Sequence, residues 1–188
     1  MGNFCRHLLL AGIIGLAVLS SCSKADFVIG KDGWPLASEH ISGAVFQKVV
    51  DGHGWRFNSA YLIDSDGRLS GEPYYSDKKD QFPVDYLFSG SNVTEYWDLD
   101  EYPDGIFRVR KFQYDESVNG ILIDGTSDMR ISSLKEDFIV AVVHVGNDTD
   151  GRKIFIRSTW RRMDEDELED VKRSHPLNYS RLLRKDNK

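Results

Sequence analysis

The feature that most constrains the fold is a series of short β-rich runs after residue 40, separated by turn residues and lacking a helical period. The predicted strands are residues 44–50, 55–63, 69–75, 84–88, 93–99, 106–114, 121–124, 129–134, 138–145 and 154–160. Asn119-Gly120 gives the strongest hairpin signal. Parallel strands need crossover helices, which are missing between the runs. The pattern predicts an all-β fold, an antiparallel up-and-down β-barrel of about 8–10 strands, with an antiparallel sandwich as the alternative.

One helix is predicted, and it begins at Asp164. Asp164 and Glu167 form an approximate capping box, and apolar residues follow at helical spacing. Pro176 should end this short C-terminal helix because proline cannot continue it. The basic residues 181–188 are expected to fray.

The first residues have the anatomy of a signal peptide. Arg6 precedes an apolar run, Leu8 to Leu19, that is too short to span a membrane. Leu19-Ser20-Ser21-Cys22 resembles the lipobox of bacterial lipoproteins, whose cysteine thiol receives diacylglycerol. The resemblance implies lipidation at Cys22, and two or three acyl chains would make the membrane anchor essentially permanent. An ordinary secretory signal with a chance cysteine is the alternative.

These signals divide the chain into segments. Residues 22–40 contain Gly30, Gly33 and Pro35 and show no core face, so we expect a lipidated tether. Ser23 is not the aspartate that retains lipoproteins at the inner membrane of enteric bacteria, and the resemblance therefore favours the outer membrane. The expected segments are a signal peptide (1–21), the tether (22–40), the barrel (41–163) and a C-terminal helix with a basic tail (164–188).

Charge and cysteine content exclude several function classes. The formal net charge is −6, whereas nucleic-acid binding needs a clustered excess of lysine and arginine. The chain has two cysteines, Cys5 and Cys22. Processing removes the first and lipidation consumes the second, so disulfides, zinc–thiolate sites and cysteine nucleophiles are excluded from the mature domain.

Three segments resemble the bacterial lipocalin-like domain lipoproteins. Residues 41–47 (ISGAVFQ) resemble their glycine-led first strand, residues 131–140 their late strand pair, and residues 154–162 their closing strand. Lipocalins proper carry a tryptophan where this chain has Val45. The resemblance implies a lipocalin-like barrel that holds a small ligand, and it specifies no particular ligand.

Aromatic and cationic residues gather on three strands that should be neighbours. The candidate ligand-binding residues are Tyr86, Phe88, Tyr96, Trp97, Arg108, Arg110, Phe112 and Tyr114. The last four share alternation parity and should project to one face of the sheet. If that face is the interior, the two guanidinium groups require an anionic partner, such as a carboxylate or phosphate headgroup. If it is the solvent face, Phe107 and Val109 point inward instead.

Other chemistry is sparse. The histidines of the mature chain lack ligand spacing, and the turns at Asp64 and Asp148 resemble calcium loops without the required glutamate. No nucleophile elbow or phosphate loop occurs. The acidic cluster Asp98, Asp100, Glu101 and Asp104 would suit a glycosidase only if two carboxylates converged. We therefore expect no enzymatic activity, no metal and no cofactor.

The leading hypothesis is a membrane-anchored envelope lipoprotein whose barrel binds a small amphipathic or hydrophobic ligand. The alternative is a macromolecule-binding envelope module, an inhibitor or glycan-binding protein, that presents Tyr96, Trp97 and Tyr102 as a surface platform. A third, a small hydrolase, would use the acidic cluster.

Replacing the proposed lipidation site tests the anchor. Cys22→Ala should leave unprocessed precursor, because the modified thiol is the substrate of processing. The size of the protein in membrane and soluble fractions measures this. Mature-sized variant protein in the soluble fraction would refute the lipobox interpretation.

Overall fold

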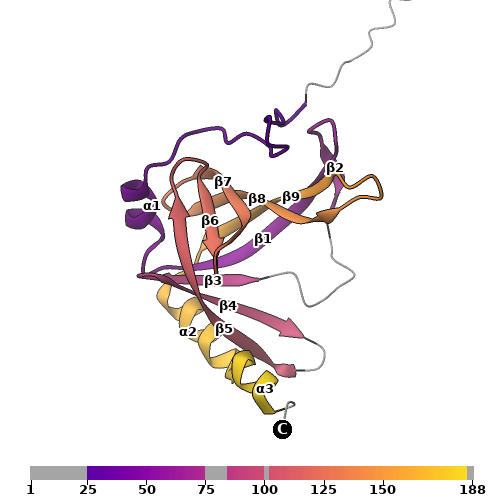
Figure 1. Cartoon of the computed structure of the whole chain (residues 1–188). Helices are drawn as coiled ribbons and strands as arrows, with labels where there is room; N and C mark the ends of the chain where they lie inside the picture. The colour runs from indigo at the N-terminus through magenta and orange to yellow at the C-terminus, as the bar shows by residue number, and fades with distance from the viewer. Residues whose placement is uncertain (1–24, 75–83, 100–101, 186–188) are drawn as a thin grey trace, which may run out of the picture.

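The computed structural model describes residues 25–74, 84–99 and 102–185, and Figure 1 shows their arrangement. Eight strands form a closed antiparallel barrel. They are β1 (Gly54–Ile63), β3 (Asp85–Ser89), β4 (Asn92–Leu99), β5 (Tyr102–Asp115), β6 (Gly120–Ile123), β7 (Thr126–Leu134), β8 (Phe138–Asn147) and β9 (Lys153–Arg162). From β3 to β9 each strand pairs with the next, and β9 and β3 both pair with β1.

This order confirms the predicted all-β, up-and-down, lipocalin-like barrel. The hairpin expected at Asn119-Gly120 joins β5 to β6, with Asp115 opposite Gly120. The late pair expected within residues 131–140 is the β7–β8 hairpin. β2 (Leu69–Pro73) lies outside the ring and pairs with the far end of β1, beyond the part that β3 covers.

The predicted strand at residues 44–50 is wrong, because this segment is helix α1 (Gly43–Val50). The Ser42 hydroxyl accepts a hydrogen bond from the Val45 amide (3.3 Å) and caps the helix. Phe46 and Val50, four residues apart, are buried on one face. The β-branched residues suggested a strand, but the buried positions follow a helical period. Residues 41–47 are therefore not the glycine-led first strand of the resemblance.

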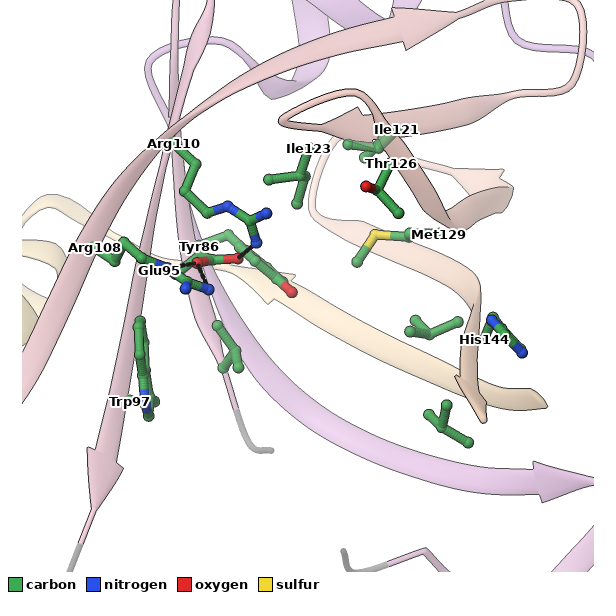
Figure 2. A pocket seen from close by; sticks show the side chains of 13 residues that line it. Tyr86, Glu95, Trp97, Arg108, Arg110, Ile121, Ile123, Thr126, Met129 and His144 are labelled. Carbon is green, nitrogen blue, oxygen red and sulfur yellow. Dashed lines mark hydrogen bonds and ion pairs between the residues drawn. The ribbon is translucent and has the colours of Figure 1, made fainter. Parts of the chain in front are cut away.

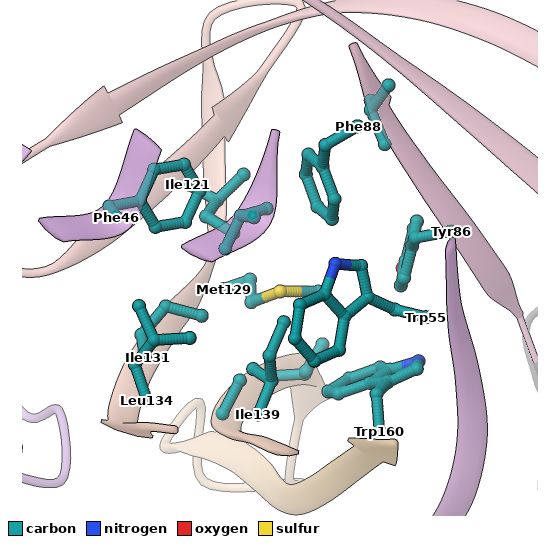
Figure 3. Close-up of a cluster of buried hydrophobic side chains, with 14 of the residues drawn as sticks. Phe46, Trp55, Tyr86, Phe88, Ile121, Met129, Ile131, Leu134, Ile139 and Trp160 are labelled. Atoms are coloured by element: carbon teal, nitrogen blue, oxygen red, sulfur yellow. The ribbon is translucent and has the colours of Figure 1, made fainter. Parts of the chain in front are cut away.

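Helix α1 closes one end of the barrel. The Phe46 ring stacks on Tyr114 with centroids 4.1 Å apart and meets the edges of Phe88 (6.3 Å) and Phe112 (6.2 Å). Phe88 lies near the end of β3, and the other two lie near the end of β5. Figure 3 shows Phe46 facing the same buried cluster as Trp55 and Trp160, which are 0% and 1% exposed.

Asn119 fixes the chain that leads into α1. This residue is buried and adopts a φ of 50°, in the left-handed region that asparagine tolerates. Its side-chain amide donates to the carbonyls of Glu39 (2.6 Å) and Ile131 (3.2 Å), and its oxygen accepts from the Ile41 amide (3.0 Å). One side chain thereby joins the segment before α1 to the β6–β7 region.

The N-terminal segment, for which the sequence predicts no core face, has one. Trp34 is 5% exposed, and its ring lies 4.8 Å from that of Phe155 on the outside of the barrel. The Arg130 guanidinium covers the other side of the indole at 4.4 Å and pairs with Asp32 (2.6 Å). Residues 25–40 therefore pack along the barrel wall and do not extend into solvent. The composition of this segment predicts irregular structure, but burial of Trp34 anchors it to the barrel.

The C-terminal segment packs beside β4 and β5 (Figure 1). Helix α2 (Glu165–Ser174) has the predicted capping box, in which Asp164 accepts from the Glu167 amide at 2.8 Å. After α2, β10 (Leu177–Asn178) pairs in parallel with β5, and α3 (Tyr179–Lys185) follows. The expected frayed tail is thus helical through residue 185. Among the described residues, no helix is long and apolar enough to cross a membrane.

Truncating the aromatic plug tests its contribution to stability. Phe46→Ala should lower the free energy of unfolding by about 3–5 kcal/mol, because it leaves a cavity between α1 and the barrel. Equilibrium unfolding in urea measures the loss. Val45→Ala, at a half-exposed position of the same helix, is the control and should change stability by about 0.5 kcal/mol or less. Equal effects of the two substitutions would contradict the role of Phe46.

Candidate functional site

A cavity of about 370 Å³ lies at the end of the barrel opposite α1. It reaches Ile123 at the end of β6, Thr126 at the start of β7 and Val145 near the end of β8. Its polar side is formed by Tyr86, Glu95, Trp97, Arg108 and Arg110. Its apolar side is formed by Val84, Ile121, Ile123, Met129, Val143 and Val145, with Thr126 and His144 at the margin. Figure 2 shows the two sides facing each other.

The environments of the β5 side chains show which face of this strand points into the barrel. Arg108 and Arg110 line the cavity, and Phe112 is buried in the core beyond them. Val109, between the two arginines, is 51% exposed. Phe107 packs outside the ring in the cluster beneath α2. The interior alternative is therefore correct, and the solvent-facing alternative for the arginines is wrong.

The anionic partner of the two arginines belongs to the protein itself. Glu95 lies directly across from Arg108 in the β4–β5 pair, and its side chain is only 8% exposed. Its Oε2 atom accepts from the Arg108 Nε (2.9 Å) and Nη2 (2.8 Å), while Oε1 lies 3.5 Å from the Arg110 Nη1. Figure 2 shows both guanidinium groups converging on this carboxylate. A buried carboxylate in this position offsets much of the cost of the two interior cations.

A second carboxylate completes the charge balance. Asp124, in the β6–β7 turn, accepts from the Arg110 Nε at 2.7 Å. Burial opposes the charged form of Arg110, but the bond to Asp124 and the charges of Glu95 and Asp124 together raise the pKa of this guanidinium. The same bond lowers the pKa of Asp124. The two arginines and two carboxylates form a balanced network, so the cavity does not require an anionic ligand.

Aromatic groups flank the network on two sides. The Arg108 guanidinium lies 5.3 Å from the centre of the Trp97 ring and 6.0 Å from that of Tyr179, the first residue of α3. These cation–π contacts orient a side chain that would otherwise sample many rotamers. Tyr86 is 7% exposed, and burial, followed by the charge of Glu95, raises the pKa of its phenol, which stays neutral near pH 7.

The structure divides the predicted ligand-binding residues into groups. Tyr86, Trp97, Arg108 and Arg110 line the cavity. Phe88, Phe112 and Tyr114 belong to the core around Phe46. Tyr96 lies on the outside of the barrel, where its ring contacts His175 after α2 (centroids 5.7 Å apart). Cys22 lies outside the described residues.

Tyr114 is a structural residue. The sequence predicted it as a ligand contact because it shares alternation parity with Arg108 and Arg110. Burial, and then the charges of Glu116 and Asp115, raise its pKa to about 12. The neutral hydroxyl donates to the Ile41 carbonyl at 2.9 Å. This bond holds the segment before α1, so the hydroxyl is not directed at the cavity.

The structure contradicts the surface platform of the binding-module hypothesis and describes only part of the acidic cluster of the hydrolase hypothesis. Tyr96 and Trp97 are 6% and 8% exposed, so they do not form the surface platform of the binding-module hypothesis. Asp98 is exposed and lies 3.4 Å from His175, while Asp100 and Glu101 of the acidic cluster lie outside the described residues. Within the described ranges, no group of three potential metal-ligating side chains occurs. Asp64 and Asp148 each accept two backbone amides of their own turns.

The sequence comparisons give no family. No protein-family model matches the chain, and no curated protein matches it. Among solved structures, the chain is similar to a bovine odorant-binding protein, a deswapped triple mutant, with 14% identity and a TM-score of 0.36. The match covers 62% of this chain and 78% of that one. The fold assignment rests on the strand pairing described above.

Neutralising Glu95 tests the internal charge balance. Glu95→Gln should lower the free energy of unfolding by about 1–2 kcal/mol, less than for a fully buried pair because Arg108 and Arg110 are 34% and 25% exposed. Added phosphate should then raise the melting temperature of the variant more than that of the unaltered protein, since an anion replaces the lost carboxylate. Thermal unfolding with and without phosphate measures both effects. Glu136→Gln, in the exposed β7–β8 turn, is the matched control, and an identical response of the two variants would contradict the role of Glu95.

Proposed function

We propose that this protein is a membrane-anchored lipoprotein of the cell envelope whose barrel binds a small amphipathic ligand and performs no catalysis. The observation that carries the proposal is the cavity, in which an apolar wall faces a fixed polar network. Its volume of about 370 Å³ lies at the lower end of the range of small-molecule sites.

The lining indicates how such a ligand would bind. Ile121, Ile123 and Met129 offer hydrocarbon contacts on one side. On the other side, guanidinium N–H groups that Glu95 and Asp124 do not fully use are directed by a rigid set of neighbours. Because the network is balanced, the polar end of the ligand needs hydrogen-bond acceptors and does not need a full negative charge. A carboxylate, a hydroxyl or a carbonyl group would satisfy it.

The anchor part of the proposal rests on the sequence. The apolar run before Leu19-Ser20-Ser21-Cys22 supports export and lipidation. The residue after Cys22 is Ser23 and not aspartate, which supports a location at the outer membrane. The partners that we propose are therefore the membrane, through the lipid, and a small amphipathic ligand. No cofactor, metal or nucleic acid enters the proposal.

Blocking the cavity tests ligand binding. Thr126→Trp places an indole at the exposed margin of the cavity, whereas Val109→Trp places the same group on the outer face of β5. The lipidated protein in lipid nanodiscs, free of detergent, should bind the fluorescent fatty acid cis-parinaric acid. Binding to Thr126→Trp should be at least about tenfold weaker, equivalent to 1.4 kcal/mol, and binding to Val109→Trp unchanged.

Native mass spectrometry of the same samples shows whether a small molecule purifies with the protein. Equal affinity of the two tryptophan variants, together with a mass of the bare lipidated chain, would contradict binding in the barrel.

A further inference from the structure

The described chain begins at a fixed point on the barrel. The Phe27 amide donates to the Gly67 carbonyl at 2.8 Å, and Asp26 accepts from the Leu69 amide at 2.9 Å. The first contact is with the β1–β2 connection and the second with the first residue of β2, at the end of the barrel that also holds the ligand cavity. Asp26 follows Cys22 by four positions, and an extended chain reaches at most about 14 Å over four residue steps. A lipid on Cys22 would therefore hold this end of the barrel close to the bilayer.

An apolar groove of about 750 Å³ lies at this same end, outside the barrel. We define the apolar groove by Ile29, Leu62, Ile63, Leu69, Ile154 and Phe155. Its walls come from the N-terminal segment, from β1 and β2, and from the start of β9. It is separate from the ligand cavity, with which it shares no lining residue.

The exposed surroundings of the groove are partly apolar and carry charges of both signs. Ile29, which is 38% exposed, lines the groove, and Val28 and Leu36, which are 67% and 52% exposed, belong to the same N-terminal segment outside the groove. Arg68, Arg152 and Lys153 stand at the margin of the groove, together with the carboxylates of Asp32, Asp64 and Asp148. Arg68 pairs with Asp66 (4.0 Å) and Arg152 with Asp150 (3.4 Å), so the charges of this margin are largely balanced. The nearby Asp64 and Asp148 each accept two backbone amides within their own turns, which partly occupies their carboxylates.

From this arrangement we infer that the barrel end bearing the β1–β2 and β8–β9 turns rests on the phospholipid bilayer, and that the apolar groove receives hydrocarbon from the membrane surface. The inference rests on the lipid anchor of the proposed function. The short reach from Cys22 makes the bilayer the surface closest to the groove. Exposed aliphatic side chains enter the boundary between headgroups and acyl chains to a depth of about 5–10 Å, and the balanced charges at the margin of the groove stay at the level of the headgroups.

Spin labels measure the depth of this end directly. Lipidation consumes the thiol of Cys22, and processing removes Cys5, so an introduced cysteine is the single labelling site. Ser65→Cys places the label in the exposed β1–β2 turn beside the groove, and Val109→Cys places it on the outer face of β5. The full lipidated protein is reconstituted in vesicles of phosphatidylethanolamine and phosphatidylglycerol. Collision rates with oxygen and with a water-soluble nickel complex are then compared.

The label at residue 65 should collide several-fold more with oxygen than with nickel, and the label at residue 109 should show the reverse. Adding Ile29→Asp should return the label at residue 65 to water while the protein still floats with the vesicles. Val45→Asp, which changes a half-exposed residue of α1 at the other end of the barrel, is the matched control and should leave the label in the membrane. Circular dichroism verifies that each variant is folded.

The remaining outcomes separate this inference from the anchor. A protein that floats with its residue-65 label in water overturns the docked orientation and leaves the anchor intact. A label shielded from both reagents, with cross-linking between two copies, assigns the groove to a protein contact and also overturns it. A protein that neither floats nor carries lipid by mass spectrometry refutes the anchor, and the docked orientation falls with it.

Discussion

Closure of the sheet is the constraint on which the rest of the structure depends. β9 pairs with β1 over most of its length, and β6 pairs with both β5 and β7. In a closed ring every strand has one inner and one outer face, so alternation along the strand assigns each side chain to one of these two faces. The inner face of β5 carries Arg108 and Arg110 in the middle of the strand and Phe112 and Tyr114 at its C-terminal end. The same strand thus supplies both the polar network and part of the seat for α1.

The interior charges persist because the fold supplies their partners at fixed positions. Register places Glu95 opposite Arg108, and the β6–β7 turn places Asp124 beside Arg110. An interior guanidinium without such a partner would be costly. The network also gives the cavity a rigid polar wall, since each charged group is held by at least one other. For the ligand that we propose, selectivity would come from this prearranged set of donors opposite a hydrocarbon surface.

Regular alternation and turn chemistry allowed the barrel and most of its strands to be predicted from sequence. Where a residue's environment depends on contacts distant in the chain, prediction failed. Tyr96 and Trp97 are adjacent in a strand and must face opposite sides, so the sequence alone should have excluded one of them. Glu95 shares the face of Trp97 and was recognisable as a partner for Arg108 only once the β4–β5 register was known. The sequence predicted a strand in place of helix α1 because the amphipathic period of the helix spans barely two turns. The burial of Trp34 depends on residues far along the chain, Ile63, Val142 and Phe155, and was not predictable locally.

The plug formed by α1 has a consequence for traffic through the barrel. Among the described residues, Phe46 packs across one end of the barrel, so the cavity at the other end is closed on the side of α1. A molecule inside must back out the way it came before a successor can enter. If the barrel carries the ligand that we propose, its turnover is limited by how fast the occupant departs, since α1 blocks passage through that end of the barrel.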